Sequence, residues 1–245
     1  MIDLHVHSTH SVDSKSRIKD IVSVAKLKGL KYVGITDHYE IRNGKLLYSF
    51  DFDKFFEDIE RNYDPEVVLL KGIEWGWDCT TEIPDFEGFD YVSLSIHRCD
   101  TPKDLAEKCY EEYYQRMKEC VEKADFDVLA HFDFIRRFVP GNPSIPDHMK
   151  DLILEILKTI KEKEAAVEIN TKPFSLYGEP HPEYWIIEKM SEMGIPVTVG
   201  SDAHNLENVG RDVDRALRLI KKAGYDGVVI FKKRKKEFIK IQSLL

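Results

Sequence analysis

The sequence predicts an α/β fold in which parallel strands, joined by helices, form a closed or nearly closed barrel. Short apolar runs typical of buried strands alternate with longer segments whose apolar residues recur at helical spacing. About seven or eight such units follow one another, and no low-complexity segment or linker divides them. We therefore expect a single domain over residues 1–245. In such barrels the working residues lie at the carboxyl ends of the strands.

The elements can be placed in order along the chain. The first strand begins at Ile2, and a helix over residues 18–27 ends before Gly29, which suits a helix C-cap. Further strands are predicted at residues 31–35, 66–73, 89–96, 127–130, 165–169, 195–199 and 228–231. Further helices are predicted around residues 52–59, 103–123, 152–160, 184–193 and 213–223. The basic run from Lys232 to Lys236 is interpreted as the solvated face of a helix in the last element.

Composition argues against several classes of function. The formal net charge is −8 and the pI is near 5.6, whereas a sequence-independent nucleic-acid binder needs a basic surface. No run approaches the ~18 apolar residues that span a bilayer, and the N-terminus enters a strand without a signal-like segment. We therefore expect a cytoplasmic protein without nucleic-acid or membrane partners, and the sequence does not indicate its oligomeric state. The four cysteines lack CxxC spacing, which favours reduced, partly buried thiols.

Metal-type ligands recur at the ends of the predicted strands. His5 and His7 alternate along the first strand, so their imidazoles point to the same face. Such a pair is weak evidence alone, but imidazoles or carboxylates also follow later strands at comparable positions. The candidate ligands are His5, His7, Asp13, His38, Glu74, His97, His131, Asp202 and His204. Because the carboxyl ends of barrel strands meet at one pole, we expect these side chains to converge.

The kind and number of these ligands predict a multinuclear metal site. Imidazole and carboxylate suit Zn²⁺, Fe²⁺ and Mn²⁺. Nine candidates are too many for one ion, and a carboxylate such as Glu74 can bridge two. Three divalent ions with three carboxylates would leave a charge of about +3, which would hold a phosphate dianion in an acidic protein. A metal pair about 3.5–4 Å apart can share a water whose pKa falls towards ~7, giving a hydroxide nucleophile at neutral pH.

Taken together, these motifs resemble the polymerase-and-histidinol-phosphatase (PHP) superfamily, and within it the histidinol-phosphate phosphatases. The resemblance runs from residue 2 to about 215. It rests on Asp3-Leu4-His5-Val6-His7-Ser8 with Asp13, Thr36-Asp37-His38, Gly72-Ile73-Glu74, Ser95-Ile96-His97, Ala130-His131 and Gly200-Ser201-Asp202-Ala203-His204. It implies one PHP-type phosphoesterase domain, a distorted (β/α)₇ TIM-like barrel with its active site at the C-terminal ends of the strands.

The resemblance also implies how a trinuclear cluster is held. One ion would be bound by His5, His7, Glu74 and Asp202. Glu74 would bridge to a second ion, completed by His97 and His131, and the third would be bound by Asp13, His38 and His204. The identity of the ions (Zn, Fe or Mn) is left open.

Two further segments bear on the substrate. Residues 131–138 resemble the family's segment that supplies a phosphate-binding arginine, and Arg137 aligns better than Arg136. Residues 168–171 resemble the next motif, but many relatives continue with Ser-Gly-Leu-Arg where this chain has Lys-Pro-Phe-Ser. A second arginine is therefore missing at that position. Lys172 can contribute a positive charge to substrate binding, but its ammonium group is a point charge and cannot form the bidentate contact that an arginine guanidinium makes with phosphate.

The reaction that the resemblance implies is hydrolysis of a small phosphomonoester, above all L-histidinol phosphate in histidine biosynthesis. A metal-bridging hydroxide would attack phosphorus in line, while the third ion and Arg137 neutralise charge on the phosphoryl oxygens. Asp202 and His204 are candidates for bringing a proton to the leaving alkoxide.

Other functions stay open at this point. Other small phosphoesters, nucleotides included, compete with histidinol phosphate because the second arginine is missing. A nuclease or proofreading module of the same superfamily is disfavoured by the acidic charge. An amidohydrolase-type enzyme also begins with His-x-His but needs a bridging lysine after the fourth strand, whereas here the bridge is Glu74 after the third. A non-catalytic metal-binding regulator would be expected to have lost ligands.

The remaining histidines and nearby aromatic residues receive structural interpretations. His148 and His181 are expected at the surface or at a helix cap, and His10 lies near the cluster but off its pattern. Trp75 and Trp77 flank a ligand loop, where ordinary packing is favoured over contact with substrate.

Overall fold

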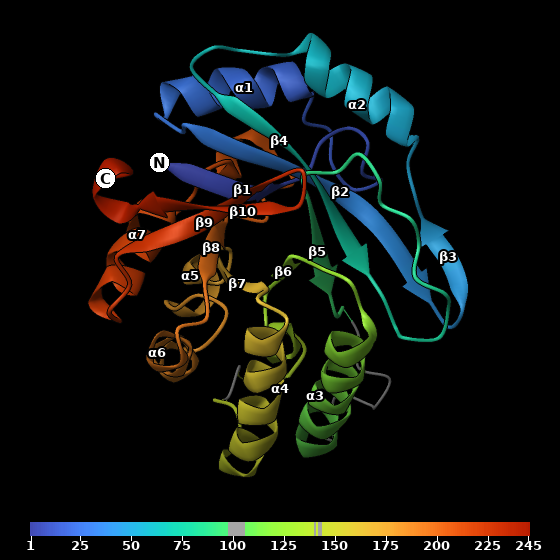
Figure 1. Cartoon of the computed structure of the whole chain (residues 1–245), viewed down its shortest axis with the longest axis vertical. Coiled ribbons are helices and arrows are strands. Elements are labelled where there is room, and N and C mark those ends of the chain that lie inside the picture. Colours follow the sequence, from blue (N-terminus) through green and yellow to red (C-terminus); the bar gives the residue numbers. More distant parts are fainter. Residues whose placement is uncertain (98–105, 140, 142–143) are drawn as a thin grey trace.

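A curved sheet of seven parallel strands, with helices around it, forms the body of the protein (Figure 1). The computed structural model describes residues 1–97, 106–139, 141 and 144–245. Along the sheet the strands are β1 (Ile2–Val6), β2 (Tyr32–Arg42), β4 (Val68–Gly76), β5 (Tyr91–Ser95), β6 (Val128–Leu129), β7 (Ala166–Asn170) and β8 (Val197–Gly200). The predicted α/β class and its distorted barrel are confirmed.

The chain just after β8 returns to β1 and nearly closes the barrel. Val6 and Ala203 form a parallel bridge. The His7 backbone N–H donates to the Ala203 carbonyl (2.9 Å), and the Ala203 N–H donates to the His5 carbonyl (3.3 Å). This closure brings the segment that carries Asp202 beside the end of the first strand, so ligands about two hundred residues apart become neighbours.

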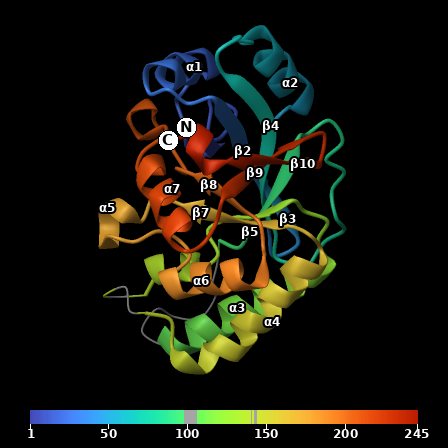
Figure 2. The same ribbon diagram turned by 60° about the vertical axis from the view of Figure 1, so that its left-hand side comes forward.

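Helices cover the outside of the sheet. The α-helices are α1 (Ile18–Leu27), α2 (Phe52–Arg61), α3 (Ala106–Lys123), α4 (Lys150–Glu162), α5 (Phe174–Tyr177), α6 (Tyr184–Met193) and α7 (Val213–Lys222). Short 3₁₀ turns are η1 (Phe134–Arg137), η2 (Asp147–Met149), η3 (Leu206–Asn208) and η4 (Ile241–Ser243). Figures 1 and 2 show α1 and α2 at the top of the molecule and α3 and α4 at the bottom, with both pairs outside the curved sheet. In the described ranges no helix is both long and apolar enough to cross a bilayer.

Local sequence signals explain several helix boundaries. After α1, Gly29 takes a left-handed backbone (φ +67°), the conformation that its predicted C-cap role requires. The apolar stripe of α4 is fully buried against the sheet, as its 3.6-residue spacing predicts; it comprises Ile153, Ile156, Leu157 and Ile160.

Strand β2 is much longer than the predicted strand at residues 31–35. It runs to Arg42 because its backbone pairs in parallel with β4 from Tyr32↔Val68 to Glu40↔Gly76. It then turns back into β3 (Lys45–Tyr48), an exposed antiparallel strand that was not predicted. Pairing with β4 therefore outweighs the polar local sequence, and it carries His38 and Glu40 forward to one end of the barrel.

The helical interpretation of the basic run is wrong. Strands β9 (Gly227–Lys232) and β10 (Lys235–Lys240) pair as an antiparallel hairpin beside β8, and the run spans the turn between them. Lys233 and Arg234 adopt positive φ angles, and their backbone N–H groups both donate to Asp90. Lysines on an exposed edge strand such as β10 also discourage pairing with another chain.

The cysteine prediction is wrong for one pair. Cys79 and Cys120 form a disulfide, with 5.5 Å between their Cα atoms, whereas Cys109 is a buried free thiol. The pairing was not predictable from spacing, because the fold alone brings the chain after β4 against α3, across 41 residues of sequence. Cys99 lies outside the described residues.

Candidate active site

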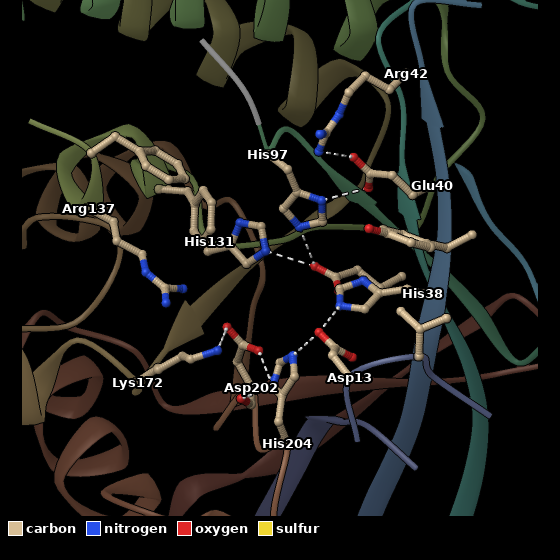
Figure 3. Close-up of a pocket in the computed structure, with 15 residues that line it drawn as sticks. Asp13, His38, Glu40, Arg42, His97, His131, Arg137, Lys172, Asp202 and His204 are labelled. Carbon is tan, nitrogen blue, oxygen red and sulfur yellow. Dashed lines mark hydrogen bonds and ion pairs between the residues drawn. The ribbon is translucent and has the colours of Figure 1, made fainter. Parts of the chain in front are cut away.

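Glu74, on β4, is the centre of the candidate metal site. It is 1% exposed, and its two carboxylate oxygens face different groups of histidines. Figure 3 shows His97, His131 and His38 turned toward this centre. Oε1 lies 3.0 Å from His97 Nε2 and 2.8 Å from His131 Nε2, and it also accepts a hydrogen bond from the Ser95 hydroxyl (2.7 Å). Two histidines that end separate strands therefore present Nε2 to one carboxylate oxygen.

The other oxygen of Glu74 faces the histidines of β1. Oε2 lies 3.4 Å from His5 Nε2 and 3.5 Å from His7 Nε2. His7 Nε2 is also 3.5 Å from Asp202 Oδ1. Glu74 thus stands between two groups of ligands, which is the position a bridging carboxylate requires.

A third group lies at the mouth of the site. Asp13 Oδ2 is 3.3 Å from His38 Nε2 and 3.1 Å from His204 Nε2. His38 also reaches inward, because its Nδ1 lies 2.8 Å from Glu74 Oε2. All nine predicted ligands therefore converge.

The geometry of these groups fits metal ions better than hydrogen bonding. Within the described residues, the buried Nε2 atoms of His5 and His7 have no hydrogen-bond partner. Two donor atoms held by one ion at about 2.0–2.2 Å lie about 3.0–3.6 Å apart. His5 and His7 lie at such separations from Glu74 (3.4 and 3.5 Å), as does His7 from Asp202 (3.5 Å). Among the residues that the structure describes, side chains close enough to share an ion form three groups: His5, His7 and Glu74; His38, Glu74 and His97; and His7, Asp13, His38 and His204.

Burial and neighbouring charges set the protonation of the metal-free cluster. Burial disfavours the imidazolium form, but the Glu74 carboxylate and its neighbours outweigh it and raise the pKa of His38 to about 11 and that of His97 to about 9. Burial opposes ionisation of Glu74 as well, yet His38 and His5 hold its pKa well below the usual range. Negative charge is thus concentrated at the centre of the cluster, where cations would bind.

Two ligands are presented by unusual backbone. His131 and Asp202 have φ angles of +24° and +52°, in a region that non-glycine residues seldom occupy. Both follow the ends of buried strands, where the chain must turn while aiming a side chain back into the barrel. Conformations of this kind concentrate at functional sites because the surrounding structure holds them.

Glu168 is a functional residue that was not among the predicted ligands. Its carboxylate lies 2.7 Å from His5 Nδ1 and accepts the His131 backbone N–H (2.9 Å), so it orients two ligands at once. The sequence contained one indication of this role. Glu168 interrupts the buried strand Ala-Val-Glu-Ile-Asn, and a charged side chain in a buried strand needs a partner.

Buried aspartates shape the loops that carry the ligands. Asp3 accepts the backbone N–H (2.8 Å) and hydroxyl (2.6 Å) of Ser201, next to Asp202. Asp37 accepts the backbone N–H and hydroxyl of Ser8, both at 2.6 Å, just after β1. These carboxylates hold the loops rather than the ions.

A cavity of about 300 Å³ opens over the cluster. Arg137 and Lys172 reach it from one side, and Lys172 Nζ lies 3.0 Å from Asp202 Oδ2 (Figure 3). The lining residues are Val12, Asp13, His38, Glu40, Arg42, Tyr48, Glu74, His97, His131, Phe134, Arg137, Phe138, Lys172, Asp202 and His204. Basic side chains, ligands and aromatic side chains thus surround one space of small-molecule size.

Arg136, in contrast, is directed away from the cavity. It is 2% exposed and pairs with Asp133 (3.3 Å), Glu183 (3.2 Å) and Glu179. Arg136 and Arg137 are neighbours in the 3₁₀ turn η1, where successive side chains point about 120° apart. This placement favours Arg137 over Arg136 as a group that meets the substrate.

The interpretation of His181 as a surface or capping residue is wrong. It is 2% exposed, its Nδ1 pairs with Asp133, and its backbone exchanges two hydrogen bonds with Asn170 of β7. The flanking prolines suggested an exposed loop, but this segment is pinned against the sheet. His148 is half exposed, as expected, and His10 lies outside the cluster, 3.3 Å from Asp58.

Trp75 and Trp77 are packing residues, as the sequence favoured. Both are buried and stack on one another with ring centroids 4.7 Å apart. Neither lines the cavity, whose aromatic wall comes instead from Tyr48, Phe134 and Phe138.

Comparison with known proteins agrees with this geometry. A family profile described as "PHP domain" matches residues 3–172, and one described as "PHP-associated" matches residues 187–213. A probable histidinol-phosphatase of Thermotoga maritima is 38% identical, over 94% of this chain and 95% of that protein. One of Clostridium acetobutylicum is 31% identical, over 96% and 98%.

A solved structure shares the fold. The histidinol phosphate phosphatase of Lactococcus lactis, complexed with zinc, L-histidinol and phosphate, superposes with a TM-score of 0.83 at 24% identity, over 96% of this chain and 98% of that one. The profile match and the extent of identity to the Thermotoga protein establish the family independently of that superposition. This chain belongs to the PHP-domain family.

Proposed function

We propose that the protein is a metal-dependent phosphomonoesterase that hydrolyses L-histidinol phosphate to L-histidinol and phosphate. The observation that carries the proposal is the convergence of nine ligand side chains on Glu74 beneath a cavity that Arg137 and Lys172 enter. Full-length similarity to probable histidinol-phosphatases supports the substrate.

The three ligand groups support three divalent ions, although they differ from the predicted sets: His38 takes the place of His131 beside Glu74 and His97, and Asp202 belongs to none of them. His5, His7, Glu74 and Asp202 would hold one ion; Glu74, His97 and His131 would hold a second; and Asp13, His38 and His204 would hold a third. Imidazole and carboxylate donors suit zinc, iron or manganese. When bound, such ions activate a water molecule for attack and neutralise charge on the phosphoryl group.

Both family-matched segments contribute to one site. His5, His38, Glu74, His97 and His131 lie in the first segment, and Asp202 and His204 lie in the second. We therefore infer that residues 1–245 act as a single phosphoesterase domain.

Arg137 and Lys172 are the groups placed to bind the phosphoryl oxygens. Arg137 is exposed in the cavity and can donate two parallel hydrogen bonds. Lys172 is held over the cluster by Asp202, and it supplies a point charge three residues before the position of the missing arginine. Together they would neutralise and orient the phosphoryl oxygens above the cluster.

The leaving alkoxide needs a proton, and His204 is the better placed of the two candidates. Burial opposes ionisation of Asp202, but Lys172 and His7 hold its pKa well below the usual range, so it carries no proton near neutral pH. His204 lines the cavity, with Nδ1 3.3 Å from Asp202 Oδ1. Because His204 would hold the third ion through Nε2 and its Nδ1 faces Asp202, it has no free nitrogen in the metal-loaded protein, so it would act on the leaving group only by orienting a water molecule that carries the proton.

Another small phosphomonoester is the second candidate substrate, and one observation favours it. A second arginine is missing from residues 172–175, and "probable phosphatase" relatives in Thermoanaerobacter are 30% identical over 91% of this chain. The aromatic wall of Tyr48, Phe134 and Phe138 suits a ring-bearing alcohol, which histidinol and nucleosides share.

Phosphate release from a substrate panel tests the proposal. The metal-loaded enzyme would be assayed with histidinol phosphate, nucleoside monophosphates, phosphotyrosine and oligonucleotides, with the Glu74→Gln protein as the blank. We expect the highest kcat/KM for histidinol phosphate. Release from another substrate with none from histidinol phosphate would overturn the assignment, and no release from any of them would overturn the phosphatase function.

A further inference from the structure

Glu40 is a buried carboxylate that no family motif includes. It lies on the unpredicted part of β2 and is 5% exposed. Its Oε2 is 2.8 Å from His97 Nδ1, and its Oε1 is 3.3 Å from the Arg42 guanidinium (Figure 3). His97 Nε2 meanwhile faces Glu74, at 3.0 Å. The imidazole of His97 is therefore held at both nitrogens, with Glu40 on the side away from the cluster.

Gly76 makes room for this carboxylate. It pairs with Glu40 across the β2–β4 register, and a Cβ added to it would lie 1.7 Å from Glu40 Oε2 and 3.1 Å from His97 Nδ1. Any larger residue would push Glu40 off the histidine. Strand pairing, the glycine and Arg42 thus independently place Glu40 against His97.

We propose that Glu40 is a positioning residue that prepares His97 to bind metal. By accepting a hydrogen bond from Nδ1–H, it fixes the tautomer in which Nε2 carries the free lone pair, and it fixes the plane of the ring. It also makes the imidazole a stronger donor to the ion. The inference rests on the metal-dependent function proposed above.

Glu168 provides a comparison within the same site. It contacts His5 Nδ1 at 2.7 Å, as Glu40 contacts His97 Nδ1, but on the opposite group of ligands. If both carboxylates position their histidines, neutralising each one should weaken a different set of ions. Glu40→Gln should affect only the ion of His97 and His131, whereas Glu168→Gln should also affect the ion of His5 and His7, because Glu168 contacts the His5 ring and the His131 backbone.

Metal retention is the direct test. Metal retention would be compared between wild type and four variants: Glu40→Ala, Glu40→Gln, Gly76→Ala and Glu168→Gln. Each protein would be loaded with zinc and dialysed against increasing concentrations of chelator, and elemental analysis would count the ions per chain. For Glu40→Ala we expect one ion to leave at roughly 10–100-fold lower chelator strength, the usual effect of removing such a partner. Gly76→Ala should behave similarly, because it displaces Glu40 without changing any charge. Glu40→Gln should lose less, because its amide oxygen still accepts the hydrogen bond.

Histidine-selective ¹⁵N NMR of the zinc-loaded proteins identifies which ion is affected. In wild type, His97 should show a protonated Nδ1 and a metal-bound Nε2; in Glu40→Ala this signature should weaken for His97 and persist for His5. Unchanged metal retention in both Glu40→Ala and Gly76→Ala would overturn the proposal. A lower Tm of these variants in the metal-free state, with normal metal retention, would also overturn it, because it would show that Glu40 only stabilises the fold. A wild-type protein that binds no zinc would instead overturn the proposed function.

Discussion

Arg136 and Arg137 are adjacent in sequence, yet the structure predicts opposite effects for their replacement. Arg136 is buried among the carboxylates of Asp133, Glu179 and Glu183, whereas Arg137 is exposed in the cavity. Methionine keeps much of the length of either side chain and removes the charge. We therefore compare Arg136→Met with Arg137→Met, each serving as the control for the other.

Arg136→Met should destabilise the fold. It leaves Glu183, which is 5% exposed, without its cation, and it leaves fully buried Asp133 with only His181 as a partner that can carry charge. Removing one partner of a buried ion pair costs about 3–5 kcal/mol. A change of 1 kcal/mol shifts the Tm of a domain of this size by about 2–4 °C, so we expect a Tm lower by about 6–20 °C.

Arg137→Met should spare stability and impair catalysis. A surface substitution usually changes the free energy of unfolding by less than about 0.5 kcal/mol. The hydrogen bonds that the guanidinium would donate to phosphate are worth about 1.5–3 kcal/mol, which corresponds to a fall in kcat/KM of about 10–160-fold.

Two measurements on metal-loaded protein separate the two roles. Circular dichroism monitors thermal unfolding, and steady-state kinetics with histidinol phosphate measures kcat/KM. Two results would refute these roles: an Arg136→Met protein with the Tm of wild type but reduced activity, or an Arg137→Met protein with wild-type kinetics.

The remaining predictions concern the cluster and its basic rim. Glu74→Gln keeps the size of the central side chain but removes its charge, so turnover should be undetectable with an unchanged far-ultraviolet spectrum; wild-type turnover would contradict the role of Glu74. In metal-free protein the pKa values of His38 and His97 are raised to about 11 and about 9, so both are protonated at pH 7 and must lose protons to bind metal. Zinc titration calorimetry in two buffers of different ionisation enthalpy should therefore show proton release that declines as pH rises through about 9, and equal heats in both buffers would argue against it. Lys172→Met should lower kcat/KM less than Arg137→Met, because lysine provides a point contact rather than a fork; an equal or larger loss would make Lys172 the principal phosphate group.

Elements with strong local signals were predictable from the sequence. The predicted helix at residues 184–193 has the observed bounds of α6, because its period and the glycine that follows it are both local features. The far half of β2 was not predictable, because pairing with β4 holds a polar segment extended. The basic hairpin was misread for a related reason: a run of lysines shows no period, and only contact with β8 and Asp90 defines its shape.

The candidate ligands were predictable because barrel topology gathers strand ends at one pole. The residues that support them were harder to find. Glu40 and Glu168 act on histidines 57 and 163 positions away, and nothing in the local sequence names those partners. Arg136 and Arg137 could be ranked by resemblance, but only the 3₁₀ turn shows that one is buried and the other faces the cavity.

Anomalous X-ray scattering from crystals of protein never exposed to chelator tests the central claim most directly. We expect three peaks, one beside each proposed set of ligands: His5, His7, Glu74 and Asp202; Glu74, His97 and His131; and Asp13, His38 and His204. Elemental analysis of the same sample should give about three ions per chain. Protein that hydrolyses histidinol phosphate with no anomalous density among these side chains would contradict it.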